Sequence, residues 1–248
     1  MKSSDSEPTT TLALISNLTH QAINPLNGVI GTLDNLIDGT IQGDRRDQRL
    51  KSARAQLEYT VSLIRNLAYF AQYGTEGSVE LKFKTTKICV IPQVLIEAAQ
   101  FFQEQATMQQ VALEVMNRAD QNCVRGDPEL LRQVFMNIFD NFVKYGESGA
   151  RVEVQQWIQK KTGDVIITFE GKSTGFTSED RIFEAGVRGK DAELKTSSGS
   201  GLGLYICKLI VERLFKGSIS GMYAAGSGLA KFEIRIPNAF VNEGVRHG

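Results

Sequence analysis

The chain has 248 residues, enough for one large domain or two modest ones, and its 42% hydrophobic content lets it bury a proper core. Lysine plus arginine equals aspartate plus glutamate at 28 each, so the zero net charge gives no electrostatic argument for nucleic acid or an anionic membrane. Cys89, Cys123 and Cys207 stand far apart, which excludes a close-spaced zinc or redox motif. We expect them to be free thiols in a reducing cytoplasm.

No apolar run approaches the roughly 18 to 20 residues that a membrane-spanning helix needs. The N-terminal stretch MKSSDSEPTTT also lacks the apolar core of a signal peptide. We therefore expect this segment to be soluble and cytoplasmic, with no membrane contact of its own.

The first predicted element is a helix that reaches from about Leu14 to Ile37 and carries one histidine, His20. Apolar residues recur along it at alternating spacings of three and four, which predicts a buried face; they are Ile15, Leu18, Ala22, Leu26, Val29, Leu33 and Leu36. In a helix, His20 points about 170° away from that face, and Asn24, one turn on, shares its side. Pro25 favours a bend after that turn. A lone histidine on a helix surface often has no function, so His20 needs support from the rest of the chain.

A second helix is predicted from about Arg46 to Tyr73, after breakers at Asp38–Asp44. Its own apolar face comprises Leu50, Ala53, Leu57, Val61, Ile64, Leu67 and Ala71. Two long helices joined by a short loop form a hairpin, and a hairpin alone cannot bury two such faces. We expect a homodimer in which two hairpins form a four-helix bundle; packing against another part of the same chain is the alternative.

After a short linker at residues 74–78, strands and helices alternate without a repeating βαβ rhythm, which predicts a mixed α/β sandwich. Asp127 and Pro128 mark one helix start as N-cap and first residue. The expected strands are 79–83, 111–116, one ending at 124–126, 151–159, 164–170, 218–223 and 230–236, and the expected helices are 92–108, 128–145 and 203–214. The fold class is therefore α+β, with domains at residues 1–77 and 78–248.

One stripe of the helix at 128–145 carries polar residues among Phe and Ile. Asn137, Asn141, Lys144 and Tyr145 fall at i, i+4, i+7 and i+8, so they share a face. An amide oxygen can ligate Mg²⁺ while a lysine one turn away meets phosphate oxygens, so the stripe suits a metal-bound triphosphate. A solvated helix face is the plainer interpretation.

Glycines at 199, 201 and 203 run directly into an apolar helix through Leu202. Glycines let backbone N–H groups approach phosphates, and a helix start adds a favourable dipole. Lys-Ser/Thr does not follow them and no strand precedes them, so the run is neither a Walker A loop nor a Rossmann turn. A flexible linker would look similar.

These segments together resemble sensor histidine kinases over about residues 10 to 237. His-Gln-Ala-Ile-Asn-Pro-Leu from His20 resembles the phosphoacceptor box, and Leu-Arg-Gln-Val with the polar stripe resembles the N box of the ATPase superfamily shared with DNA gyrase. The glycine run resembles the second glycine box, and Arg181-Ile182-Phe183-Glu184 resembles the F box. The resemblance implies a helical hairpin for dimerisation and phosphotransfer, followed by an ATP-binding sandwich.

By that resemblance Asn141 is the Mg²⁺ ligand, while Asn137, Lys144 and Tyr145 line the nucleotide. Residues 186–198 would form a lid over ATP, from which Arg188 and Lys190 could reach phosphates. These two residues could equally well be ordinary solvent-exposed cations of a loop, with no contact to phosphate. The cofactor-binding set also includes Gly199, Gly201, Leu202 and Gly203 of the second glycine box, and Ser173 and Gly175 of the first.

The sequence departs from the family pattern at two places. The first glycine box has Ser173 where the adenine-binding aspartate is expected and Thr177 at its second glycine. Replacing a charge-assisted hydrogen bond by a neutral one loses roughly 1 to 2 kcal/mol. Gln21 follows the histidine where an acid is usual; its carbonyl can orient the imidazole but cannot act as base, so autophosphorylation should be slower.

The resemblance implies a two-component kinase core that autophosphorylates His20 from Mg-ATP and passes the phosphoryl group to an aspartate of a response-regulator receiver domain. Gln21 and Asn24 would assist, Asn24 at the position that orients water for dephosphorylating the partner. The alternative is a dimeric histidine phosphotransferase or pseudokinase with a degenerate ATP-binding domain. A gyrase-type ATPase acting on DNA is disfavoured by the zero net charge and by the histidine box.

Overall fold

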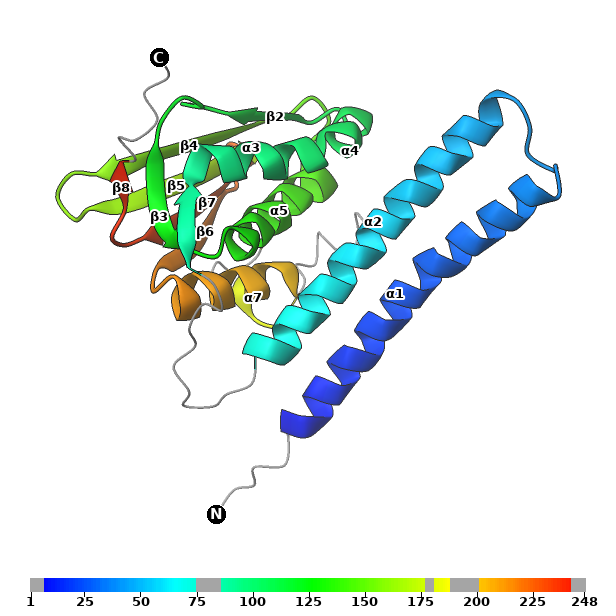
Figure 1. Ribbon diagram of the computed structural model, residues 1–248, viewed down its shortest axis with the longest axis horizontal. Coiled ribbons are helices and arrows are strands. Elements are labelled where there is room, and N and C mark those ends of the chain that lie inside the picture. Colours follow the sequence, from blue (N-terminus) through cyan, green and yellow to red (C-terminus); the bar gives the residue numbers. More distant parts are fainter. Residues whose placement is uncertain (1–6, 75–85, 177–180, 188–200, 242–248) are drawn as a thin grey trace. The chain divides into compact units, whose positions relative to one another are not determined.

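The computed structural model describes residues 7–74, 86–176, 181–187 and 201–241 (Figure 1). The chain divides into two compact units, residues 1–75 and residues 76–248.

Two long helices make up the first unit and lie side by side (Figure 1). They are α1 (Glu7–Ile37) and α2 (Asp44–Tyr73). Pro25 lies inside α1, which continues through it. The turn between the helices contains Gly39 and Gly43, whose φ angles of 71° and 60° lie in the left-handed region that favours glycine.

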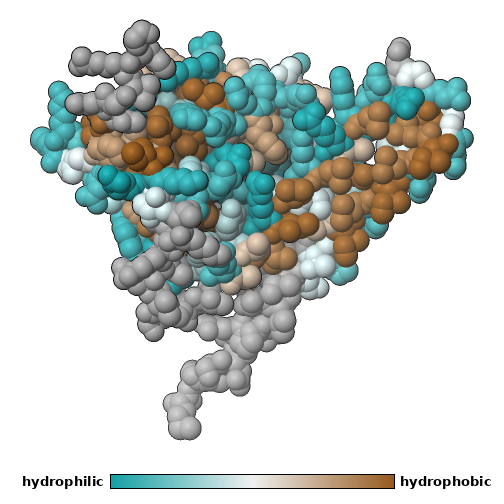
Figure 2. Space-filling model, viewed as in Figure 1, coloured by the Kyte–Doolittle hydropathy of each residue, from teal (hydrophilic) through white to brown (hydrophobic). Residues whose placement is uncertain are grey.

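The apolar faces of this hairpin are only partly covered. Val29 of α1 and Ala53 and Leu63 of α2 are buried. Other large apolar side chains remain exposed, and they are Ile23, Ile30, Leu33, Ile37, Leu50, Leu57, Val61 and Ile64. Figure 2 shows apolar surface running along the hairpin. A pair of helices can cover only the strip where they touch, so the rest of each apolar face stays open to solvent.

The second unit is an α/β sandwich built on two sheets. The larger has the strand order β2-β4-β5-β7-β6, antiparallel except for the parallel pair β2 and β4, and the smaller has the order β1-β3-β8. The strands are β1 (Lys87–Val90), β2 (Ala112–Val115), β3 (Asn122–Gly126), β4 (Arg151–Gln159), β5 (Asp164–Lys172), β6 (Ser218–Ala224), β7 (Leu229–Ile236) and β8 (Phe240–Val241).

Helices cover one face of the larger sheet (Figure 1). They are α3 (Ile91–Phe101), α4 (Gln103–Met108), α5 (Pro128–Tyr145), α7 (Gly203–Lys208) and η2 (Leu209–Leu214), a π-helix that continues α7. A short 3₁₀ helix, η1 (Arg181–Phe183), lies between β5 and α7 in the sequence. Aromatic side chains fasten α5 to the sheet: the rings of Phe135 and Phe139 lie 5.9 and 5.2 Å from that of Phe169, and Phe142 lies 5.8 Å from Phe232. These ring contacts fix the height and rotation of α5 over β5 and β7.

The start of α5 is as the sequence predicts. Asp127 is the N-cap and its carboxylate accepts a hydrogen bond from the Glu129 N–H at 3.0 Å, while Pro128 occupies the first turn. The mixed α/β sandwich is likewise confirmed.

Several predicted elements differ in detail. The single helix expected at 92–108 is divided at Phe102, which has non-helical backbone angles and a buried ring. The short strands β1 and β8 were not predicted, because two to four residues carry too little alternation to be recognised. The strand expected at 79–83 lies outside the described residues. Among the helices of the described ranges, none is long and apolar enough to cross a membrane.

Candidate functional site

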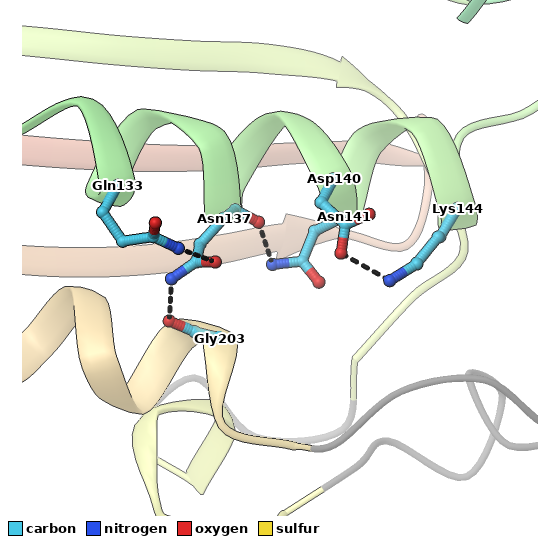
Figure 3. A network of polar contacts seen from close by, with 6 residues as sticks. All are labelled: Gln133, Asn137, Asp140, Asn141, Lys144 and Gly203. Atoms are coloured by element: carbon cyan, nitrogen blue, oxygen red, sulfur yellow. Dashed lines mark hydrogen bonds and ion pairs between the residues drawn. The ribbon is translucent and has the colours of Figure 1, made fainter. Parts of the chain in front are cut away.

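Asn141 presents an amide oxygen from the polar face of α5 (Figure 3). Its Nδ2 donates to the backbone carbonyl of Asn137 at 2.9 Å, which fixes the amide plane. Among the described residues no donor is bonded to its Oδ1. A half-buried, oriented amide oxygen is a donor that suits a hard cation such as Mg²⁺. The residue that the resemblance marks as metal ligand thus has the group needed for that task.

Lys144 is held beside this amide by Asp140. Its Nζ lies 2.5 Å from Asp140 Oδ2, and the two side chains are 19% and 27% exposed. The acid precedes the lysine by four residues, the favourable order on a helix. Lysine has three N–H donors, so the ammonium group can keep Asp140 and still donate to a phosphate oxygen. No pattern in the sequence singles out Asp140.

Asn137 is buried, and its amide is used inside the protein. Its Oδ1 accepts from Gln133 Nε2 and its Nδ2 donates to the Gly203 carbonyl, each at 3.1 Å (Figure 3). The bridge joins α5 to the first residue of α7. Sequence reasoning placed Asn137 at the nucleotide and passed over Gln133, although Gln133 lies one turn before Asn137 on the same stripe. The role of Asn137 toward a nucleotide stays a prediction.

Ser173 and Thr174 close the end of α5. The carbonyl of Tyr145, the last residue of the helix, accepts from Thr174 N at 2.8 Å, Thr174 Oγ1 at 2.9 Å and Ser173 Oγ at 3.2 Å. Ser173 is buried, and its hydroxyl proton points to backbone carbonyls. What it can still offer to a base is a lone pair, as an acceptor.

Gly175 lies against an aromatic cluster. A Cβ at this position would come within 2.5 Å of the Tyr223 ring, so a side chain is excluded by packing. The ring of Phe176 lies 5.7 Å from that of Tyr223 and 5.9 Å from that of Phe232. Tyr223 comes from β6, far along the chain, and no local pattern in the sequence connects it with Gly175.

Gly201, just before α7, is also explained by packing. Gly201 has φ 66°, and a Cβ there would lie 2.7 Å from the carbonyl carbon of Gly186. Gly186 N–H in turn donates to the Gly201 carbonyl at 3.1 Å. The side chain of Leu202 is fully buried, so it serves the core. Gly199 and Arg188, with most of the expected lid, lie outside the described residues.

Cys207 of α7 lies against the same stripe. Its Sγ donates to the Val134 carbonyl at 3.5 Å. Burial raises the pKa of the Cys207 thiol to about 12, outweighing the hydrogen bond with Asn137, which lowers it. The residue therefore remains a neutral thiol at physiological pH. All three cysteines are free and buried, as the sequence predicts for the thiols themselves.

The predicted histidine site lies in the first unit. His20 and Asn24 of α1 are exposed, and Gln21 between them is half-buried. Exposure leaves the imidazole accessible to a reacting group, which a nucleophile requires. The structure therefore divides the predicted residues between two units: His20, Gln21 and Asn24 in one, and the described residues of the α5 stripe and the glycine boxes in the other.

The chain is similar in sequence to known protein families and proteins. Residues 126–239 match the family described as histidine kinase-, DNA gyrase B-, and HSP90-like ATPase. The chain is 28% identical over 232 residues to the sensor protein KdpD of Clostridium acetobutylicum, covering 90% of this chain and 24% of KdpD. It is also 28% identical over 204 residues to the sensor histidine kinase AruS of Pseudomonas aeruginosa, covering 81% of this chain and 20% of AruS. The chain thus spans about a quarter or less of these relatives.

Solved structures share the fold. Full-length ShkA, solved in complex with AMPPNP, is similar with a TM-score of 0.60 and 20% identity over 93% of this chain and 47% of ShkA. The histidine kinase ThkA, solved in complex with the response regulator protein TrrA, has a TM-score of 0.57 and 15% identity over 94% of this chain and 64% of that chain.

Residues 126–239 therefore belong to this ATPase family. Together with the similarity to sensor histidine kinases over most of the chain, this match confirms the resemblance to a histidine kinase catalytic core drawn from the motifs.

Proposed function

We propose that the chain is the core of a two-component histidine kinase, in which the second unit binds Mg-ATP and His20 accepts the phosphoryl group. The observation that carries the proposal is the pairing, on one face of α5, of the Asn141 amide oxygen with the Lys144 ammonium. A hard cation and a triphosphate need these two kinds of group side by side. The family match over residues 126–239 supports the same conclusion.

In this proposal Asn141 holds Mg²⁺, which neutralises phosphate charge, and Lys144 donates to phosphate oxygens while it keeps Asp140. Ser173 offers its lone pair to the adenine amino group, with Gly175 beside it. The remaining expected contacts are Asn137, Tyr145, Arg188, Gly199, Gly201, Leu202 and Gly203; because the Leu202 side chain is buried, only its backbone can take part.

His20 is the proposed phosphoacceptor, and its solvent exposure supports that role. Gln21 orients the imidazole but removes no proton, because an amide has no basic site near neutral pH. Asn24 positions water for dephosphorylating the partner. That partner is an aspartate-bearing receiver domain, and the complex of ThkA with the response regulator protein TrrA supports this choice.

The proposed assembly is a homodimer through the hairpin. Two sets of exposed apolar side chains repeat every seven residues: Ile23, Ile30 and Ile37 on α1, and Leu50, Leu57 and Ile64 on α2. A strict seven-residue apolar repeat is typical of helices that supercoil around one another. A second hairpin placed on these rows would complete a four-helix bundle.

One observation favours a second candidate, a phosphotransfer module or pseudokinase with a degenerate nucleotide site. Ser173 replaces the expected carboxylate by a neutral hydroxyl whose proton is already donated to backbone. Adenine would then lose a charge-assisted hydrogen bond. If affinity for ATP is lost altogether, His20 would receive its phosphoryl group from a phosphorylated receiver instead.

Calorimetry with Mg-ADP and Mg-AMPPNP distinguishes the two candidates. The kinase proposal expects binding by the wild type and its loss in Asn141→Ala. Asn35→Ala is the matched control, because Asn35 Nδ2 also donates to the carbonyl four residues earlier, Gly31, at 2.7 Å, but on α1. Absence of binding by the wild type up to millimolar nucleotide would reject the kinase and leave the phosphotransfer module.

Radiolabelling from γ-labelled ATP tests the acceptor. His20→Ala should abolish the acid-labile label, whereas His247→Ala, which removes the other histidine of the chain, should leave it unchanged. Labelling that survives His20→Ala would reject the assignment.

Sedimentation tests the dimer. Leu57→Asp places a charge in an exposed apolar row and should yield monomers, whereas Ser52→Asp, an exposed polar position of the same helix, should not. A Leu57→Asp chain that stays dimeric would contradict the proposed interface.

A further inference from the structure

Two buried side-chain amides of α5 form a relay to the first residue of α7. Gln133 and Asn137 are 2% and 4% exposed, one helical turn apart. Gln133 Nε2 donates to Asn137 Oδ1, and Asn137 Nδ2 donates to the carbonyl of Gly203 (Figure 3). Buried amides with both ends bonded are strongly oriented, because an unpaired end would lose its hydration without replacement.

The direction of the relay is set at its far end. The Gly203 carbonyl can only accept, so Asn137 must turn its NH₂ group toward it. The Asn137 oxygen then faces Gln133, which must answer with its own NH₂ group. Turning the Asn137 amide over would place two oxygens against each other at Gly203 and two NH₂ groups at Gln133. The Gly203 carbonyl therefore selects one of the two orientations of the Asn137 amide, and the NH₂ group of Gln133 stabilises that orientation.

The beginning of α7 also has contacts that do not involve the relay. Leu202 is buried in the core, and Cys207 donates to the Val134 carbonyl on α5. These contacts fix where the turn lies. The relay adds a hydrogen bond to the Gly203 carbonyl, and so restrains the orientation of the peptide that joins Gly203 to Leu204.

We infer that Gln133 is a positioning residue for the first turn of α7, which begins at Gly203, acting through Asn137 and without contact to nucleotide. By holding the Gly203 carbonyl toward α5, it restrains the peptide that joins Gly203 to Leu204 at the start of α7. The consequence for phosphate binding rests on the proposed function. The effect on α7 itself does not, because it follows from the relay in the protein alone.

Hydrogen exchange on the protein without nucleotide tests the relay. Gln133→Met keeps side-chain length and helix propensity but removes the donor. We expect the amides of the first turn of α7, among them Ile206 N–H, which donates to the Leu202 carbonyl at 2.8 Å, to exchange about tenfold faster. In an Asn137→Ala background, Gln133→Met should add nothing further, because its partner is gone.

Phe135→Leu is the control, since Phe135 packs its ring against Phe169 on the sheet side of α5. It should leave exchange in α7 unchanged. Equal acceleration by the control, or additive effects of Gln133→Met and Asn137→Ala, would overturn the inference.

Binding of Mg-AMPPNP by calorimetry and of adenosine by NMR titration completes the test. Gln133→Met should weaken Mg-AMPPNP about tenfold and leave adenosine within about twofold, because the relay orients the segment proposed to meet phosphates. Equal loss for both ligands would mean general damage to the domain and would overturn the inference. A wild type that binds neither ligand would instead refute the proposed function, while the exchange measurements would still decide whether Gln133 holds α7.

Discussion

Gly201 precedes α7 and Gly203 is its first residue, and we expect opposite responses to alanine at these two glycines. At Gly201, φ is 66°, where an L-residue costs about 1 to 2 kcal/mol. The added methyl would also lie 2.7 Å from the carbonyl carbon of Gly186 and 3.0 Å from its oxygen. These are backbone atoms that cannot rotate away, so the hydrogen bond from Gly186 N to Gly201 O is lost as well, at about 0.5 to 1.5 kcal/mol.

The sum is about 1.5 to 3.5 kcal/mol, which for a domain of this size lowers the melting temperature by roughly 3 to 14 °C. Gly203→Ala is the matched control. Its new Cβ would meet the nearest heavy atom, Asn137 Cβ, at 3.7 Å, an ordinary contact, and alanine favours a helix over glycine. Its melting temperature should stay the same or rise slightly.

Differential scanning calorimetry of both variants measures the difference directly. A Gly201→Ala chain as stable as the wild type would contradict the contact with Gly186. A Gly203→Ala chain destabilised as much as Gly201→Ala would show that the two positions are not distinguished by packing.

Three further outcomes follow from single contacts. Asp127→Ala removes the N-cap hydrogen bond to Glu129 N–H and should lower the free energy of unfolding, measured with urea, by about 1 kcal/mol. Asp127→Asn keeps an acceptor and should lose clearly less. Equal losses in the two variants would contradict the role of Asp127 as N-cap. Gly175→Ala should lower the melting temperature because its methyl meets the Tyr223 ring, and the loss should shrink in a Tyr223→Ala background; a loss that persists there would point elsewhere. Because burial raises the pKa of Cys207 from 9.0 to about 12, the unfolded chain releases this proton first, so the free energy of unfolding should fall above pH 9 by up to about 1.4 kcal/mol per pH unit. Urea titrations at several pH values should show a shallower fall in Cys207→Ala, and parallel slopes would refute the argument.

Most of the regular secondary structure could be predicted from the sequence, because the residues that determine it lie next to one another in the chain. The helix at 128–145 was predictable to the residue at its start, since an N-cap aspartate and a first-turn proline act on the backbone next to them. Strands β4, β6 and β7 show alternation of period two, whereas β5 is a short run of mostly apolar residues that is buried continuously. The division of the 92–108 helix at Phe102 was not predictable, because it depends on where a ring finds space in the core.

The amino-acid pattern alone indicated which residues could carry the chemistry: a histidine on a helix surface, a stripe of amides and a lysine on one helix, and a glycine run leading into another. These are matters of residue type and spacing. The tertiary structure decided how each polar group is used. In the folded chain Lys144 forms an ion pair with Asp140, and the Asn137 amide is hydrogen-bonded to Gln133 and Gly203. The Ser173 hydroxyl donates to the Tyr145 carbonyl at the end of α5. Hydrogen-bond partners from distant segments meet only in the folded chain, so spacing along the sequence cannot assign them.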